Sequence, residues 1–211
     1  MCISDPPDRP LSVKGFGMPE SVIVLPPPRQ QGGMALLEAI ARRRTIREIG
    51  SGPLPPQTLS DLCYAAAGVN APDGRRTIAT ARNVQDLVLY VAMPQGLYRY
   101  DAAAHRLLLE RPEDVRPFCG EQHDMHANAA VVLIYVSDLR VYDGVITDPS
   151  LAPFYAGVHA GSASQNVYLY ATANRLATVV CNWIDKPSLK TAMQLPPDLH
   201  IQLTQPVGPV C

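Results

Sequence analysis

The run AVVLIYV at residues 130–136 decides the fold class of this chain. It is short and continuously apolar, and such a run is typical of a strand in the middle of a sheet that is covered on both faces. Residues 87–93 predict a second buried strand, and residues 97–100 with 106–109 predict a hairpin. We therefore expect a sheet that is at least partly antiparallel.

A long helix and further strands are predicted after this central run. From about Pro153 to Asn174 small residues stand among larger apolar ones on nearly every side, so this helix should run through the core or a subunit interface. Residues 177–180 predict another strand, Asp185 begins a short helix, and residues 200–207 close the sheet. Because helices and strands mix without a regular βαβ repeat, the expected fold class is α+β.

The N-terminal part predicts an arm and two helices. Residues 1–33 carry many of the 21 prolines, which indicates an extended arm rather than a domain of its own. Residues 34–211 are expected to form one domain, beginning with a helix that ends near Arg44. A second helix is expected from about Pro55 to Gly68, and a polar loop follows it.

Composition excludes several classes of protein. The chain of 211 residues is 47% hydrophobic and 18% charged, which indicates one globular domain with a substantial core. Its net charge of -1 argues against a nucleic-acid-binding protein, which would need a broad basic surface. No apolar run reaches the roughly 18 residues of a membrane helix, and the N-terminus lacks the regions of a signal peptide. We expect no nucleic-acid partner, no membrane and a cytoplasmic protein.

Metal and side-chain catalysis are not indicated either. The five cysteines are odd in number, widely spaced and free of any C-x-x-C pair, so neither a disulfide framework nor a zinc site is predicted. His123 and His126 have a spacing that could ligate a metal from one helix face, yet no further ligand motif accompanies them. No nucleophile elbow, P-loop or dinucleotide fingerprint is present. We predict no metal ligands and no catalytic side chains.

The run RRRTIR at residues 42–47 is the main candidate for a binding site. Arginine offers a rigid fork of donors that matches phosphate or carboxylate, and it stays charged at any working pH. After the helix, Thr45 and Ile46 favour extended backbone, so Arg43, Thr45 and Arg47 could face one side. The alternative is that the arginines only complement the dipole at the helix end. Four of them exceed what capping needs.

Six motifs in order resemble the nitroreductase-like flavoproteins, and within them the branch named for the dehydrogenases that oxidise peptide azolines. The resemblance covers about residues 34–208 and is carried by RRTIR (43–47), TARNVQ (80–85), GLYRYD (96–101), the segment 160–168, TVVCNW (178–183) and QPVG (205–208). It implies a three-layer α+β fold with a mixed, mostly antiparallel sheet flanked by helices. It also implies a homodimer that holds one FMN in each of two clefts at the subunit interface.

The resemblance assigns roles residue by residue. The family segment that binds the FMN phosphate and ribityl chain matches Arg43, Arg44, Thr45 and Arg47. The loop that reaches the flavin from the partner subunit matches Thr80, Ala81 and Asn83, with Gln85 as its support. Gln122 matches an amide that bonds the flavin ring, and Cys181 and Asn182 fall where backbone amides approach the flavin edge. Val180 and Gly208 complete the cofactor-binding set. Without the resemblance, Asn83 and Gln85 could cap a turn and Gln122 could be a surface residue.

Three departures from the family pattern bear on the site. Asn182 stands where Gly is common, although Asn tolerates positive φ better than most residues. The family usually continues after Gly208 with a basic tail, whereas this sequence stops at Cys211, so retention of FMN would depend more on the arginines. Arg82 and Trp183 are bulky for their surroundings and could narrow the substrate opening, although Trp183 could equally be core packing.

The expected function is therefore that of an FMN-dependent oxidoreductase. NAD(P)H would reduce the flavin and leave, and a nitroaromatic, quinone or activated alkene would take the electrons in the same cleft. Few catalytic side chains are needed because the cofactor carries the chemistry. Two alternatives stay open: a dehydrogenase that oxidises an azoline-like substrate, and a flavin-binding scaffold without turnover.

Overall fold

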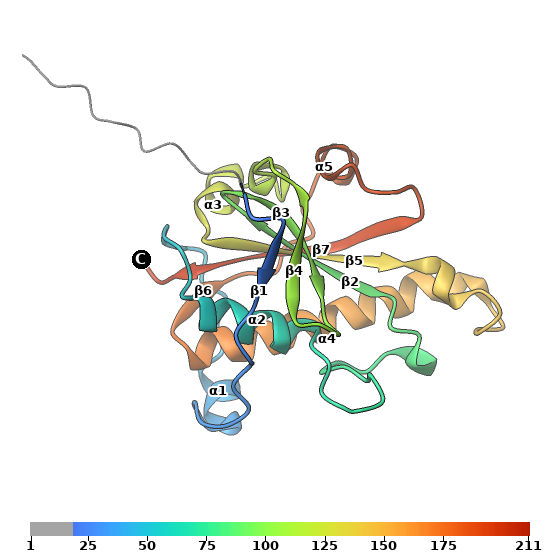
Figure 1. Ribbon diagram of the computed structural model, residues 1–211, viewed down its shortest axis with the longest axis horizontal. Helices are drawn as coiled ribbons and strands as arrows, with labels where there is room; N and C mark the ends of the chain where they lie inside the picture. The colour runs from blue at the N-terminus through green and yellow to red at the C-terminus, as the bar shows by residue number, and fades with distance from the viewer. Residues whose placement is uncertain (1–18) are drawn as a thin grey trace, which may run out of the picture.

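A seven-stranded sheet forms the centre of the computed structural model, which describes residues 19–211 (Figure 1). The strand order is β1-β4-β3-β2-β5-β7-β6. The strands are β1 (Val22–Val24), β2 (Leu87–Met93), β3 (Gly96–Asp101), β4 (Arg106–Arg111), β5 (Val131–Asp138), β6 (Leu176–Thr178) and β7 (Leu199–Pro209). The helices are α1 (Leu36–Arg42), α2 (Pro56–Ala67), α3 (His123–Asn128), α4 (Ala152–Ala173) and α5 (Lys186–Met193).

All strand pairs in the described part of the chain are antiparallel, so the sheet is more regular than the mixed one that the sequence led us to expect. The reason lies in the connections. β2, β3 and β4 follow one another through short turns, and each later strand enters the sheet beside a neighbour that runs the opposite way. The expected α+β class is confirmed.

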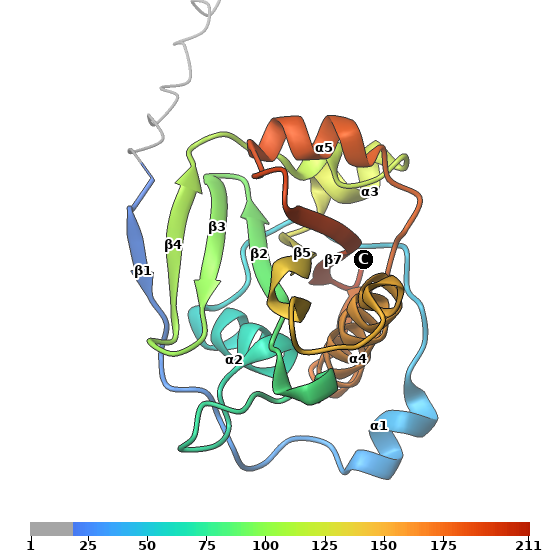
Figure 2. The same ribbon diagram turned by 90° about the vertical axis from the view of Figure 1, so that its right-hand side faces the viewer.

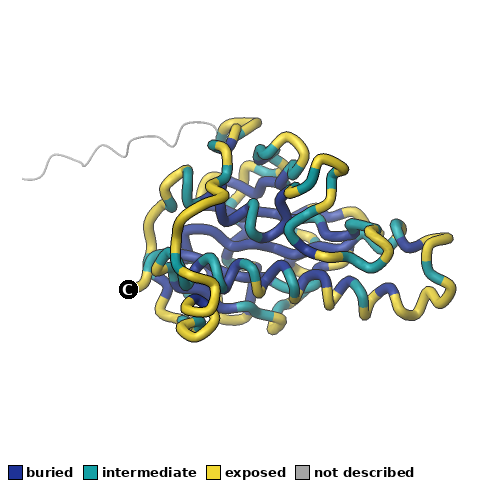
Figure 3. Tube along the Cα trace, turned by 90° about the horizontal axis from the view of Figure 1, so that it is seen from below, coloured by how far each residue is buried: buried dark blue, intermediate teal, exposed yellow. Residues whose placement is uncertain are grey.

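The central strand β5 connects the two halves of the core. Its alternate side chains point to opposite faces, as the pleat of a strand requires. Val131, Leu133 and Tyr135 join one buried cluster with α2 and α4, and Val132 and Ile134 join a second cluster with α5. The molecule therefore has three layers, with α2 and α4 on one face of the sheet and α3 and α5 on the other (Figure 2). In Figure 3 the buried residues run as a band through the sheet.

The helix α1 lies outside these layers, at the side of α4, and buries only Ala39 among its residues (Figure 2). The sequence predicted it from apolar residues at helical spacing, and the helix is present, although it ends at Arg42 rather than Arg44. Its apolar side chains are nevertheless open to solvent in the single chain: Leu36 is 64%, Leu37 79% and Ile40 52% exposed. A helix with an uncovered apolar face is typical of a surface that packs against another molecule.

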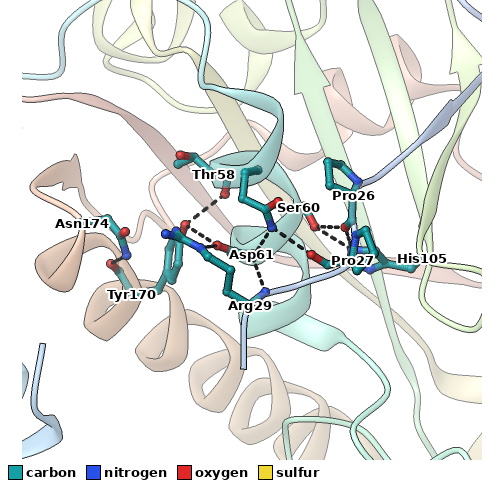
Figure 4. Close-up of polar contacts among 10 residues, drawn as sticks. Pro26, Pro27, Arg29, Thr58, Ser60, Asp61, His105, Tyr170 and Asn174 are labelled. Carbon is teal, nitrogen blue, oxygen red and sulfur yellow. Dashed lines mark hydrogen bonds and ion pairs between the residues drawn. The ribbon is translucent and has the colours of Figure 1, made fainter. Parts of the chain in front are cut away.

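The described part of the predicted arm is fastened to the body of the protein. β1 extends the sheet beside β4, a pairing that the sequence did not reveal. Beyond β1, the backbone N–H and Nε of Arg29 donate to the carboxylate of Asp61 on α2, at 2.8 and 2.6 Å, and Ser60 Oγ donates to the carbonyl of Pro26 (Figure 4). Residues 1–18 of the predicted arm lie outside the described part of the chain.

Candidate functional site

The arginine segment leaves α1 and lies against the C-terminal half of α4. Its backbone is held by the N–H of Ile46, which donates to the carbonyl of Thr178 at 3.1 Å. The guanidinium of Arg43 lies 5.1 Å from the ring centre of Tyr168, and the hydroxyl of Thr45 lies 3.1 Å from the hydroxyl of the same tyrosine. Arg43 and Thr45 therefore share one side, as the extended backbone led us to expect.

Tyr168 connects this segment to a second predicted motif. Its hydroxyl also accepts the backbone N–H of Val180 at 2.9 Å, so one buried ring on α4 joins residues 43–45 to residues 180–183. We did not single out Tyr168 from the sequence. The available signal was its place at the end of the 160–168 motif, because a buried tyrosine hydroxyl usually needs a hydrogen-bond partner.

The four arginines have different surroundings. Arg42 pairs with Glu38 one turn earlier at 2.8 Å. Arg44 turns back to the carbonyls of Ala41 and Arg43, at 3.0 and 2.7 Å, so the alternative role at a helix end describes this residue. Among residues 19–211, neither Arg43 nor Arg47 has an ion pair with a carboxylate. These two positive charges are left for an anion.

An open cleft of about 520 Å³ lies beside Arg47. Gln122 lines it at the start of α3, so the structure brings together two residues that the resemblance assigned to one cofactor. The N–H of Glu121 donates to the carbonyl of Trp183 at 3.1 Å, which places residues 180–183 next to the same cleft. The cleft is lined by Arg47, Glu121, Gln122, His123, Asp124 and Met125.

The backbone amides of residues 180–182 are not equally available. The N–H of Val180 is taken by Tyr168, and the N–H of Cys181 donates to the carbonyl of Thr204 at 2.8 Å. Asn182 is exposed, its backbone is not in the positive-φ region, and its N–H has no partner among the described residues. Of the two predicted amides, those of Cys181 and Asn182, only that of Asn182 lacks a partner among the described residues.

The surroundings of Trp183 and Cys181, in the same segment, bear on their roles. Trp183 is 72% exposed, so it belongs to the surface and not to the core. Burial raises the pKa of the Cys181 thiol, although Arg47 acts in the opposite direction. The thiol is therefore protonated at neutral pH, which makes it a poor nucleophile.

Gly208 has a packing role in the described chain. A Cβ atom at this position would lie 2.6 Å from the carbonyl oxygen of Gly50 and 2.8 Å from Cγ2 of Ile49. Gly208 also pairs with Ala177 between β7 and β6. Its buried surroundings account for the glycine without a ligand, so a contact between Gly208 and a cofactor stays a prediction.

The loop of residues 80–85 lies apart from the arginine segment, at an earlier part of α4. The N–H of Ala81 donates to Nε2 of His159, nine residues before Tyr168 on α4, which corresponds to roughly 13 Å along a helix. Within the loop, Gln85 donates to Asn83 Oδ1 at 3.3 Å and its backbone N–H donates to Thr80 Oγ1 at 3.1 Å. Gln85 thus supports the turn, and its role in a loop that contacts the flavin stays a prediction. The single chain does not bring this loop to the arginine segment.

Metal and membrane features were also sought in residues 19–211. In that range no group of three or more His, Cys, Asp or Glu side chains could hold a metal ion. His123 and His126 instead contact the carbonyls of Pro117 and Gln122. None of the described helices combines the length and the apolar character needed to span a membrane.

The fold and the site define a three-layer α+β protein in which two arginines lack carboxylate partners in the described chain, and one of them, Arg47, lines an open cleft. The model of the family described as "Nitroreductase family" matches residues 40–209, and the chain belongs to this family. A protein of Methanocaldococcus jannaschii named "Putative nitroreductase MJ1384" is 29% identical over 153 residues, which are 68% of this chain and 76% of that protein.

Solved structures agree with this assignment. The crystal structure of a "putative nitroreductase" from Ralstonia eutropha JMP134 is similar with a TM-score of 0.87 and 35% identity, covering 93% of this chain and 92% of that one. A "putative nitroreductase in complex with FMN" from Desulfovibrio desulfuricans has a TM-score of 0.60 at 18% identity, covering 84% and 87% of the two chains. The second likeness concerns the fold alone.

Proposed function

We propose that this protein is an FMN-dependent oxidoreductase that transfers electrons from NAD(P)H to a small acceptor. The observation that carries the proposal is a pair of arginines, in a chain of the nitroreductase family, that lack carboxylate partners among residues 19–211: Arg43 lies over the ring of Tyr168, and Arg47 lines a cleft that also holds Gln122. Two guanidinium groups without carboxylate partners suit a phosphate monoester such as that of FMN. FMN supplies the hydride chemistry when bound.

The residues of the chain would bind and orient the cofactor. Arg43 and Arg47 bind the phosphate end, and Tyr168 holds Arg43 through its ring and Thr45 through its hydroxyl. Gln122 and the free N–H of Asn182 bond the polar edge of the ring system. The thiol of Cys181 stays protonated and takes no part. The nitroaromatic, quinone or activated alkene would enter beside the exposed Trp183.

We also propose that the active form is a homodimer. The loop of residues 80–85 and the arginine segment contact α4 nine residues apart, roughly 13 Å along the helix, which supports a site in which the two come from different subunits. The uncovered apolar face of α1 supports an interface close to the arginine segment, because α1 leads directly into it.

Absorption spectroscopy of the purified protein tests the proposal. We expect a yellow protein whose flavin, released by denaturation, is FMN. Under anaerobic conditions NADH or NADPH should bleach it, and a quinone or nitroaromatic should restore the colour. A colourless protein that cannot be reconstituted with FMN would refute the proposal.

Two other outcomes would change the function and keep the cofactor. Bound FMN that neither nicotinamide reduces, but that an azoline-containing peptide bleaches, would favour the dehydrogenase alternative within the same family. Bound FMN that no donor reduces would favour a scaffold without turnover.

A further inference from the structure

A buried histidine lies under the loop of residues 80–85. His159 on α4 is 3% exposed, and Asp86, which follows the loop, is 1% exposed. Nδ1 of His159 lies 2.5 Å from Oδ1 of Asp86, and Nε2 lies 2.8 Å from the backbone nitrogen of Ala81. The hydroxyl of Tyr142 is 3.2 Å from Nδ1, and the ring of Tyr155 stacks on the imidazole at 6.4 Å.

These contacts define the protonation state of the imidazole. The partner of Nε2 is a backbone N–H, which can only donate, so Nε2 must carry its lone pair. The proton of the neutral ring is then on Nδ1, where it is donated to the carboxylate of Asp86. A ring protonated on both nitrogens would direct one N–H at another. The bond to Ala81 therefore requires neutral His159, and Asp86 selects the tautomer that makes it.

The loop above this histidine is strained. Arg82, Asn83 and Gln85 have φ values of 53°, 55° and 51°, in the left-handed region of backbone conformation that residues other than glycine rarely adopt. Three such residues within four positions persist only when surrounding contacts hold them. The bond from Ala81 to His159 is the contact that ties the loop to the core of the protein, whereas the bonds of Gln85 lie within the loop and to the neighbouring Gly74.

We propose that neutral His159 is a positioning residue that holds the loop of residues 80–85 in the shape in which it contacts the flavin site of the partner subunit. The idea rests on the proposed function for the flavin contact, but the anchoring of the loop belongs to the single chain. Because the N–H of Ala81 is used by His159, the loop presents the exposed Arg82 and Asn83 outward. Asp86 acts through His159 by fixing its tautomer.

Two substitutions distinguish the effect of losing the hydrogen-bond acceptor of His159 from the effect of changing its side-chain volume. His159→Phe fills the space but has no acceptor, and His159→Gln retains an oxygen that can accept the N–H of Ala81. Hydrogen exchange is measured on the protein without FMN, with the N–H of Cys181, which is bonded to Thr204, as the reference amide. We expect exchange at Ala81 and Asn83 to accelerate about tenfold in the Phe variant and much less in the Gln variant. The surface substitution His200→Phe controls for loss of a histidine.

FMN titration and steady-state kinetics complete the experiment. We expect His159→Phe to weaken FMN binding and lower kcat with little change in KM for the nicotinamide, and His159→Gln to restore both in part. If the N–H of Ala81 exchanged as slowly in the Phe variant as in the wild type, the proposal that His159 anchors the loop would be wrong. A loosened loop with unchanged FMN affinity and kcat would overturn the positioning role. If the wild-type protein bound no FMN, the proposed function would be refuted. Faster exchange in the loop of the Phe variant would still support anchoring by His159, because exchange is measured without the cofactor.

Discussion

Individual arginines in one short segment have separate tasks. Arg42 and Arg44 are satisfied locally, by a carboxylate of the preceding turn and by carbonyls at the end of α1. Arg43 and Arg47 are not, and one lies over an aromatic ring while the other borders an open cleft. Within six positions, arginine therefore has two roles: Arg42 and Arg44 stabilise the end of α1, and Arg43 and Arg47 belong to the proposed cofactor site.

This difference predicts unequal effects on FMN affinity. Replacing Arg47 by alanine should weaken FMN binding by about 10- to 100-fold, because a charge-assisted hydrogen bond to the phosphate contributes about 1.5–3 kcal/mol. Arg42→Ala is the matched control and should leave the affinity unchanged, since Arg42 already pairs with Glu38. Quenching of FMN fluorescence on titration measures both. Equal affinity for Arg47→Ala and the wild type would remove Arg47 from the site.

A second residue-scale prediction concerns Gly208. Replacing it by alanine should lower the free energy of unfolding by about 1–3 kcal/mol, because the new Cβ would meet backbone that cannot rotate away. Gly161→Ala on α4 is the control, since its Cβ would meet nothing within 4 Å and alanine favours a helix. Urea unfolding followed by circular dichroism compares the two. A Gly208→Ala protein as stable as the wild type would show that Gly50 can move.

At the scale of elements, local signals were enough where they were strong. The apolar run at residues 87–93 predicted β2 with the bounds that it has, and Asp185 caps α5 through the N–H of Ser188 as its position suggested. β1 could not be predicted, because three residues acquire a strand only by pairing with β4 more than eighty residues away. The same limit applies to the site: the contact of Asp86 with His159 spans 73 positions and leaves no local pattern.

The attachment of the arm to α2 is an element-scale prediction with a pH dependence. Burial raises the pKa of Asp61, but hydrogen bonds from Arg29 and Gln57 outweigh it and leave the pKa lowered. A lowered pKa means that the stabilisation is present above the unfolded value of about 3.9 and is lost as the pH falls through the folded value. Asp61→Asn should therefore cost about 1–3 kcal/mol at pH 7 and progressively less below about pH 4.

Urea unfolding across this pH range measures the effect. Asp73→Asn is the control, because Asp73 pairs with Arg75 at an exposed position, where an ion pair contributes little. A difference between Asp61→Asn and the wild type that stays constant down to pH 3 would contradict the role of the ionised carboxylate.

For the whole molecule, the question is how two separate halves of a site come together. The arginine segment follows α1 and contacts the C-terminal half of α4, and the loop held by His159 lies nearer the N-terminus of that helix. α1 exposes Leu36, Leu37 and Ile40, and the N-terminal half of α4 exposes Phe154 and Val158. Burying apolar side chains between two copies of the chain would contribute roughly 25 cal/mol per Å² of area. A dimer would cover these residues and could complete the site in one step.

Leu37→Glu tests this arrangement. Leu37 is 79% exposed in the single chain, so the substitution should leave the subunit fold intact while placing a charge in the proposed interface. We expect sedimentation to show monomers and FMN affinity to fall sharply, with an unchanged circular dichroism spectrum. Val24→Glu is a matched control, because Val24 is 77% exposed on the edge strand β1, away from α1, and should remain a dimer with bound FMN. If Leu37→Glu also remained a dimer with normal FMN affinity, α1 would lie outside the interface. The arginine segment and the loop would then have to meet through a different face, of which the exposed part of α4 is the next to test.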